Sequence, residues 1–314
     1  SFNLRPYPMH FNEPRPRKLL KGIAPPAAPA PLAWYNGAQN NAIAGNAPDW
    51  GWLLSPGYVP PSIATDSPIQ ANAWVKFAHE WLNSRALSDG ANLQVIDQFP
   101  QWHEAITRAF HEQHPELNGE NTPAMRRPWL DAAVIDIVRT RNGVEVRYAS
   151  TGLIAIGIHS GIQDQWVMPP SLGWHRQHFA KFRNDIAKYG HDSGAGKKAM
   201  TDWHTYCRKN INQPGGFNAW SLGDPFMRGW ASGRIHISEM PFSVVLYNLG
   251  ALGLVDIFQC YSTHKDVFDY IRTHKRMDLL LEKVRSAQAA DPLCKKFPRS
   301  MVELPVGMLA VHGE

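Results

Sequence analysis

Apolar residues recur with the period of an α-helix along much of the chain. In the first such stretch, residues 71–87, the apolar side chains stand at i, i+3, i+4 and i+7, and these are Trp74, Phe77, Ala78 and Trp81. This spacing predicts an amphipathic helix with an aromatic face. Four further stretches are predicted to be helical: 101–114, 174–189, 200–210 and 265–290. The apolar stripe along the last of them needs a partner surface within the protein or outside it.

Residues 133–148 alternate apolar and polar side chains on both sides of Asn142-Gly143. A period of two is typical of a strand that is buried on one face, and Asn-Gly is a preferred pair at a type I′ turn. The pattern therefore predicts a β-hairpin over 133–148. Residues 153–158 are predicted to add a third strand, which gives a small antiparallel sheet.

The most apolar part of the chain lies at 240–255, where sixteen residues carry no charge. We predict a single helix over 241–261, with Gly250 and Gly253 forming a surface for close packing. The apolar run falls between a core helix and a membrane span, which usually needs about twenty apolar residues. A polar side chain such as Asn248 is costly in lipid unless another helix faces it. A buried helix and a membrane-associated helix are therefore both open alternatives.

Residues 1–68 have no hydrophobic period and hold thirteen of the twenty-five prolines. Each proline removes a backbone donor and favours extended geometry in the residue before it. Between Gly22 and Thr65 the only formal charge is that of Asp49. A structureless run of this length is unusual inside a compact domain. We therefore expect 1–68 to be an extended arm that becomes ordered by docking along partner proteins.

The composition argues against some classes of partner and of framework. The chain has 314 residues, of which 44% are hydrophobic and 19% charged, and its net charge is +5. Lys and Arg are scattered and no nucleic-acid-binding motif accompanies them, so no nucleic acid partner is expected. Cys207, Cys260 and Cys294 are odd in number and widely spaced, which does not make a disulfide framework. Twelve tryptophans either fill the core or bury surface against partners.

Histidine and cysteine patterns are the first candidates for chemistry. His204 and Cys207 stand at i and i+3 on the predicted helix 200–210, so they can form a thiolate pair or two metal ligands. A zinc site needs three or four ligands and no further motif completes one, which favours a buried structural cysteine. Two histidine pairs also share helix faces, and these are His111 with His114 and His175 with His178. Such pairs permit metal binding but are not specific for it.

Residues 190–198 look at first like a phosphate-binding loop, because glycines precede a lysine. The spacing fails, since Lys197 is followed by Lys198 instead of Ser or Thr and the preceding residues are helical. Gly190 is better explained as the C-cap of that helix, followed by a mobile loop. The sequence also lacks the Gly-x-Ser-x-Gly, His-Glu-x-x-His and Gly-x-Gly-x-x-Gly patterns. It therefore predicts no catalytic, cofactor-binding or metal-binding residue and no cofactor.

Together these patterns predict an α+β protein that is dominated by helices and has a small antiparallel sheet. Three regions are expected along the chain. They are an extended Pro/Ala-rich arm at 1–68, an α+β body at 69–235 and a C-terminal helical region at 236–314, which contains the apolar helix 241–261.

The arm, the aromatic residues and the lack of a catalytic motif favour a non-catalytic structural or accessory subunit of a large multiprotein assembly. In composition the chain resembles accessory subunits of respiratory and ATP synthase complexes. The expected partners are several protein subunits, with membrane contact through 241–261. The start at Ser1 fits either a removed presequence or a truncated chain, and the basic N-terminus together with the apolar helix favours a location at the mitochondrial inner membrane. Two alternatives stay open. One is an enzyme of the secreted-effector type that uses His204 and Cys207, and the other is a virion structural protein.

Overall fold

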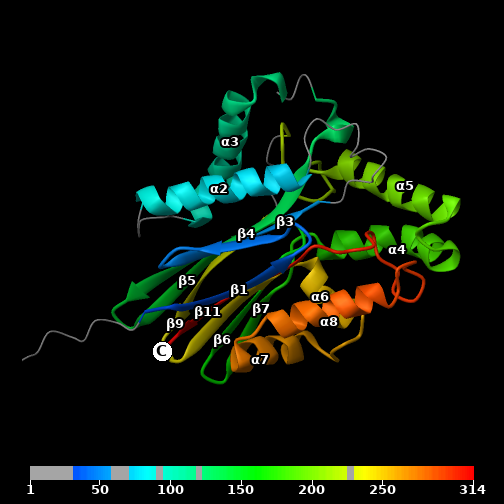
Figure 1. Ribbon diagram of the computed structural model, residues 1–314. Helices are drawn as coiled ribbons and strands as arrows, with labels where there is room; N and C mark the ends of the chain where they lie inside the picture. Colours follow the sequence, from blue (N-terminus) through cyan, green and yellow to red (C-terminus); the bar gives the residue numbers. More distant parts are fainter. Residues whose placement is uncertain (1–30, 58–70, 90–94, 118–121, 225–229) are drawn as a thin grey trace, which may run out of the picture. The chain divides into compact units, whose positions relative to one another are not determined.

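The computed structural model describes residues 31–57, 71–89, 95–117, 122–224 and 230–314. Residues 31–314 form one compact unit, which is built around two antiparallel sheets. Helices cover the outer face of each sheet, and a further helix pair stands at one end of the sheets (Figure 1). The expected helix-dominated fold with a small sheet is therefore wrong, because the two sheets form the centre of the molecule.

The first sheet has five strands: β1 (Ala33–Gln39), β6 (Ala155–Ser160), β7 (Gln163–Val167), β10 (Phe242–Tyr247) and β11 (Val306–Gly313). Their order is β1-β11-β10-β6-β7. The second sheet has six strands: β2 (Ile43–Asn46), β3 (Trp50–Pro56), β4 (Trp129–Thr140), β5 (Gly143–Ser150), β8 (Trp220–Ser221) and β9 (Ala231–Ile237). Their order is β2-β3-β4-β5-β9, with the short β8 paired to β4. Strands from all three predicted regions thus share these sheets.

Side chains alternate between two cores along each central strand. In β4, Ala133, Ile135 and Ile137 belong to the core between the sheets, whereas Ala132 and Val134 belong to the core beneath the covering helices. The same alternation holds in β10 and β11. Because both faces of these strands are buried, their residues are almost continuously apolar. In an antiparallel sheet with one solvated face, apolar and polar residues alternate instead.

Two layers of helices cover the sheets. The six-stranded sheet is covered by α2 (Ala71–Asp89) and α3 (Val95–Gln113), and the five-stranded sheet by α6 (Leu249–Asp256), α7 (His264–His274) and α8 (Asp278–Ala289). The predicted aromatic face of α2 packs inward through Trp74. Two short 3-10 helices follow α3: η2 (Pro115–Leu117) and η3 (Ala124–Arg126).

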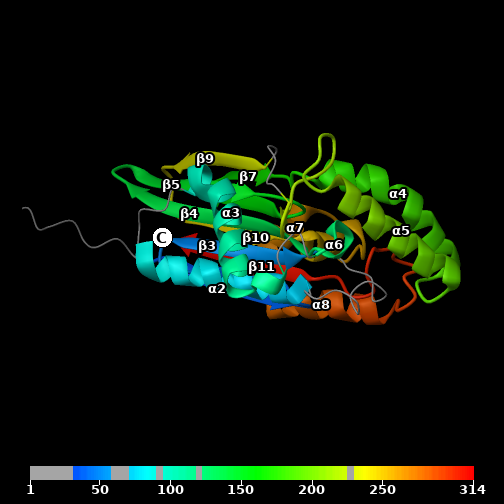
Figure 2. The ribbon, with the colours of Figure 1, turned by 90° about the horizontal axis from the view of Figure 1, so that it is seen from above.

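A separate helix pair, α4 (Leu172–Tyr189) and α5 (Gly194–Asn210), lies side by side at one end of the sheets (Figure 2). Gly190 ends α4 with φ +82°, as predicted for its C-cap. The Ser193 hydroxyl then accepts from the Gly196 amide at 2.9 Å and begins α5. The expected mobile loop over 190–198 is therefore wrong, since Gly194 and the residues after it are helical.

The predicted hairpin is confirmed as β4 and β5, with Thr140 opposite Gly143. Its turn differs from type I′, because the two residues between this pair, Arg141 and Asn142, lack the positive φ that this turn requires. The third strand is also present, as β6, but it pairs with β10 and β7 in the other sheet. A strand prediction from local pattern thus located the element and missed its partner.

The predicted single helix over 241–261 is wrong. Residues 242–247 are β10, in the middle of the five-stranded sheet, and α6 starts immediately afterwards with Asn248 as its N-cap. None of the helices in the described part of the chain is long and apolar enough to cross a membrane. Gly250 does mark a close contact, because a Cβ there would lie 2.1 Å from the Pro305 carbonyl oxygen.

Two further predictions need correction. Residues 265–290 form two helices, α7 and α8, because Lys275 adopts a left-handed conformation with φ +54° and ends the first. In the predicted arm 1–68, residues 33–56 contain β1, β2 and β3, so this part belongs to both sheets. Residues 1–30 and 58–68 of the arm lie outside the described residues.

The buried amide of Asn248 joins the ends of three strands. Its Nδ2 donates to Ser55 Oγ at 2.8 Å, after which β3 ends, and to the Pro305 carbonyl at 3.0 Å, just before β11 begins. Its Oδ1 accepts from the Gly307 amide at 3.0 Å and from the Ala251 amide, which caps α6, at 3.3 Å. Both sheets and one helix therefore meet on a single side chain.

We expect Asn248→Ala to lower the free energy of unfolding by about 3 kcal/mol. The substitution leaves buried partners such as the Gly307 amide without a hydrogen bond, and each such group costs about 1–3 kcal/mol. The matched control is Thr263→Ala, which removes the exposed N-cap of α7 and should cost about 1 kcal/mol. Urea unfolding measures both. A loss at Asn248 no larger than that at Thr263 would contradict the expectation.

Candidate ligand site at the end of the sheets

A small pocket lies where the ends of the two sheets meet α4 and α5. It has a volume of about 80 Å³. Its walls are mainly apolar and aromatic, and they include Trp129, Trp174, Trp203, Phe217, Leu249, Met301 and Leu304. We call it the inner pocket. Four of the polar residues that line it are Asp131, His175, His204 and Cys207.

A larger cleft of about 520 Å³ adjoins the inner pocket, and we call it the outer cleft. One side is formed by α4 and another by residues 296–300. The two cavities share four lining residues: His175, Leu249, Ser300 and Leu304. A ligand in the outer cleft therefore lies directly beside the inner pocket.

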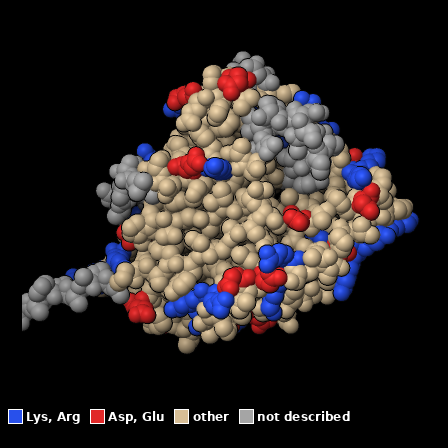
Figure 3. Space-filling view, in the orientation of Figure 1, with Lys and Arg blue, Asp and Glu red and all other residues tan. Residues whose placement is uncertain are grey.

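The outer cleft is positively charged. Arg176, Arg183 and Lys296 line it, and Asp256 is the one carboxylate among its described lining residues. Arg176 pairs with Asp256 at 2.9 Å, whereas Arg183 and Lys296 are exposed. In the space-filling view, Lys and Arg side chains gather along the edge formed by α4 and α5 (Figure 3). The excess of cations suits an anionic ligand.

Arg299 stiffens the wall of the cleft. Its buried guanidinium donates to Asp291 Oδ2 at 3.2 Å and to the carbonyls of Phe297 at 3.0 Å and Val302 at 2.9 Å. The Asp291 carboxylate also accepts the amides of Lys296 and Phe297. This charge is therefore used within the wall, and the segment that carries Lys296 is held in one conformation.

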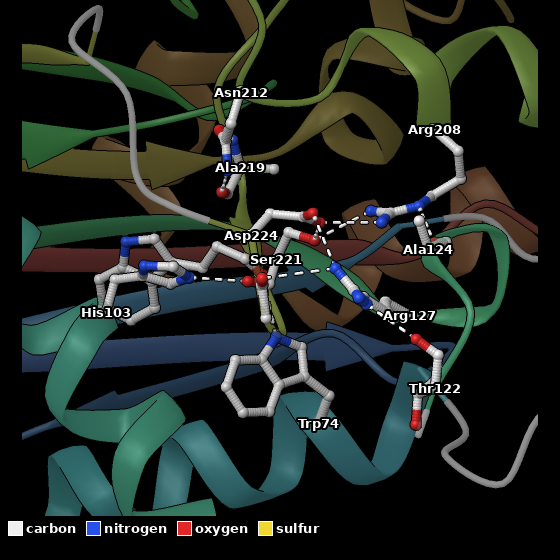
Figure 4. A network of polar contacts seen from close by, with 12 residues as sticks. Trp74, His103, Thr122, Ala124, Arg127, Arg208, Asn212, Ala219, Ser221 and Asp224 are labelled. Carbon is white, nitrogen blue, oxygen red and sulfur yellow. Dashed lines mark hydrogen bonds and ion pairs between the residues drawn. The ribbon is translucent and has the colours of Figure 1, made fainter. Parts of the chain in front are cut away.

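A second buried network positions α5 (Figure 4). Arg208 donates to Asp224 Oδ2 at 2.8 Å, to Ser221 Oγ at 2.9 Å and to the Ala124 carbonyl at 2.8 Å. Arg127 reaches the other oxygen of Asp224 at 3.3 Å. The network joins the end of α5 to β8 and η3. It thereby fixes the helix whose side chains line the inner pocket.

Asp131 is the acidic group of the inner pocket. It stands near the start of β4, and its Oδ2 accepts the Leu153 amide at 3.1 Å. Gly152 allows this approach, because a Cβ at this position would lie 1.7 Å from Asp131 Oδ1. Its φ of +68° also favours glycine. Burial raises the pKa of Asp131 to about 7, against the weaker effect of the Leu153 hydrogen bond. Near neutral pH this carboxyl is therefore present in both protonation states.

The structure brings His204 and Cys207 to the same pocket, but it does not make them a reactive pair. Cys207 is buried, and its burial together with the nearby Asp131 raises the pKa of the thiol well above the ordinary value. Reactivity follows the thiolate fraction, so this thiol is unsuited to nucleophilic attack. The His204 ring stacks on Trp129 with centroids 5.1 Å apart.

In the predicted pairs, His175 and His178 make different contacts, whereas His111 and His114 both pack against Phe110. His175 lines the inner pocket, and burial lowers its pKa to about 4, so it is neutral at pH 7. His178 instead forms a hydrogen bond with Tyr206 at 2.9 Å. His111 and His114 lie at the end of α3, away from the residues that line the two cavities. Among the described residues, no three His, Cys, Asp or Glu side chains are placed to hold a metal ion.

Sequence reasoning missed the charged residues that line the site, which are Asp131, Arg176, Arg183 and Lys296. Arg183 and Lys296 belong to no motif and come together only in the fold. Asp131 did leave a signal in the sequence. It stands two residues before Ala133, so it shares the face of β4 whose residues pack in the core between the sheets. A carboxylate in that register is unusual and marks a functional or structural role.

No protein-family model matches the chain, and no curated protein matches its sequence. Solved structures do match its fold. The serine/threonine phosphatase of S. agalactiae is 11% identical, with 90% of this chain and 100% of that chain covered and a TM-score of 0.52. The Mycobacterium tuberculosis serine/threonine phosphatase PstP/Ppp is 9% identical, with 91% of this chain and 100% of that chain covered and a TM-score of 0.49. The catalytic domain of PstP in complex with 2 manganese ions is 9% identical, with 90% of this chain and 98% of that chain covered and a TM-score of 0.48.

The likeness to the S. agalactiae serine/threonine phosphatase shows that the chain shares the fold of that enzyme. The fold is thus one on which an enzyme is built. This finding contradicts the expected non-catalytic structural or accessory subunit of a respiratory or ATP synthase complex, and the virion structural protein as well. The expected mitochondrial inner-membrane location is wrong too, because the membrane contact on which it rested was a single helix over 241–261, and this segment is a strand followed by a short helix.

The described residues do not fit a pair of metal ions. A two-metal centre requires several carboxylates or histidines around ions about 3.5–4 Å apart, and no such group occurs in the described ranges. At the ends of β3 and β10 stand the neutral side chains of Ser55 and Asn248, which bond to each other. We therefore derive no metal-dependent step for these residues.

The raised pKa of Asp131 predicts a pH dependence of stability. Its folded-state pKa of about 7 exceeds the ordinary value of 3.8, so the folded protein binds more protons between these limits. The contribution of Asp131 to the free energy of unfolding is therefore present at pH 4 and is lost as the pH rises towards 7. Within this window the free energy of unfolding falls by about 1.4 kcal/mol for each rise of one pH unit.

Asp131→Asn should show a smaller loss of stability between pH 4.5 and pH 7.5 than the parent protein in urea unfolding. Some loss should remain, because burial also raises the pKa of Asp136 to about 7. An unchanged pH dependence in Asp131→Asn would mean that the carboxyl of Asp131 ionises normally.

Proposed function

We propose that the protein binds a segment of a partner protein that is phosphorylated on serine or threonine, with the phosphate in the outer cleft. The observation that carries this proposal is the group of cations at Arg176, Arg183 and Lys296 beside a cavity of about 520 Å³. A phosphate dianion is recognised best by guanidinium groups, which form charge-assisted hydrogen bonds in pairs.

Two further observations support the proposal. The S. agalactiae protein with the same fold is a serine/threonine phosphatase, so a phosphorylated protein side chain is a ligand class for which this fold is suited. The rigid wall around Arg299 also keeps Lys296 in place before a ligand arrives. The several partner subunits expected from the sequence stay a prediction.

Hydrolysis of the bound phosphoester is a second candidate function, and Asp131 favours it. A carboxyl whose pKa lies near 7 is suited to donate a proton to a leaving oxygen at neutral pH. The inner pocket places this group next to the cleft.

Arg183→Ala should weaken binding of a phosphoserine peptide about tenfold or more, because a hydrogen bond to a charged group contributes about 1.5–3 kcal/mol. Fluorescence anisotropy with labelled peptides measures the affinity. The control is Lys188→Ala, which removes a cation from the same helix outside the lining of the cleft and should leave the affinity unchanged.

The unphosphorylated peptide provides the second comparison and should bind at least tenfold more weakly to the parent protein. Equal affinity for the two peptides would overturn the proposed phosphate recognition. Release of inorganic phosphate during the same incubation, with its loss in Asp131→Asn, would establish the second candidate, and intact peptide after long incubation would exclude it for that substrate.

A further inference from the structure

The inner pocket has walls suited to an apolar group. Trp129, Trp203 and Leu304 on its walls are at most 5% exposed, and Trp174 and Met301 complete an apolar surface. The polar groups at its margin are largely engaged within the protein. Asp131 accepts the Leu153 amide, and the His175 ring packs against Phe179 and Trp203.

The volume of the pocket limits the size of that group. An apolar cavity of about 150 Å³ in a protein core accommodates benzene. The inner pocket, at about 80 Å³, is roughly half as large. It therefore suits a branched aliphatic side chain such as that of valine, isoleucine or leucine, and it is too small for an aromatic ring.

The shared walls couple this pocket to the charged cleft. Leu249 and Leu304 line both cavities, so the inner pocket and the outer cleft are adjacent along these side chains. The neighbouring side chain of a peptide whose phosphate contacts Arg183 is therefore close to the inner pocket. Asp131 in the pocket would repel a second acidic side chain there.

We propose that the inner pocket is a specificity subsite that takes an aliphatic side chain adjacent to the phosphorylated residue. The inference rests on the proposed function of the outer cleft and adds the class of sequence that the site selects. Burying one extra methylene in a fitted apolar pocket changes affinity by about 10–200-fold. Phosphopeptides with isoleucine beside the phosphoserine should thus bind at least tenfold more tightly than those with alanine.

The test compares phosphoserine peptides with isoleucine, alanine, phenylalanine or lysine at either neighbouring position, each also in its unphosphorylated form. In the parent protein, isoleucine should bind most tightly. Preference for phenylalanine would show that the pocket is larger than a subsite for aliphatic groups. Preference for lysine would show that Asp131 selects a cation instead, and either result would overturn the inference.

Two variants locate the preference. Cys207→Leu fills the pocket from α5 and should reduce the isoleucine-to-alanine affinity ratio to near one. If overpacking unfolds that variant, Cys207→Ser keeps the shape, makes the wall polar and should lower the ratio severalfold. Arg183→Ala should weaken both peptides equally and keep the ratio. If a folded Cys207 variant kept the isoleucine-to-alanine affinity ratio of the parent protein, the preference for isoleucine would come from another part of the protein, and the inference would be wrong.

The outcomes separate the two proposals. Phosphorylated peptides that bind no better than their unphosphorylated forms would defeat the proposed function. Clear phosphate dependence without a preference for isoleucine would leave the proposed function standing and defeat only the inner subsite.

Discussion

The amide of Asn248 is the contact on which the architecture of the functional end depends. It satisfies both of its donors and both lone pairs of its oxygen with groups from β3, α6 and the start of β11. Because a buried amide must find partners for all of these groups, the ends of the two sheets have little freedom to separate. The inner pocket lies against Ser55, Gly250 and Pro305 and inherits that rigidity.

The same contact decides where the charge of the site is located. Ser55 and Asn248 are neutral and bond to each other, so the ends of β3 and β10 contribute little electrostatic field. The cations stand instead on α4 and on the segment that Arg299 holds. The proposed recognition of an anion therefore depends on α4 and the adjoining loop, whereas the sheets provide the scaffold and the apolar floor.

Local pattern predicted those elements that are defined by near neighbours in sequence. The hairpin of β4 and β5 and the helices α2 and α4 follow from alternation, helical spacing and a glycine C-cap. The prediction of a single helix over 241–261 was wrong because β10 is buried on both faces and is as apolar as the buried helix α6. Periodicity alone does not distinguish a buried strand from a buried helix. The missing signal was Asn248, a preferred N-cap residue placed directly before a helical run.

The site was beyond such reasoning because its parts come from distant segments. The proline content of 1–68 as a whole hid the strands within 33–56, where only Pro48 and Pro56 occur, so the end of β3 that contributes Ser55 to the pocket was assigned to an arm. Histidine and cysteine drew attention as reactive types, yet their packing makes Cys207 a poorly ionised thiol and His175 a neutral ring. Burial instead raises the pKa of Asp131, which makes it the titratable group of interest. No motif marks this residue, because its sequence context is an ordinary strand. At the inner pocket, the protonation state of a side chain therefore depends on its desolvation as much as on its residue type.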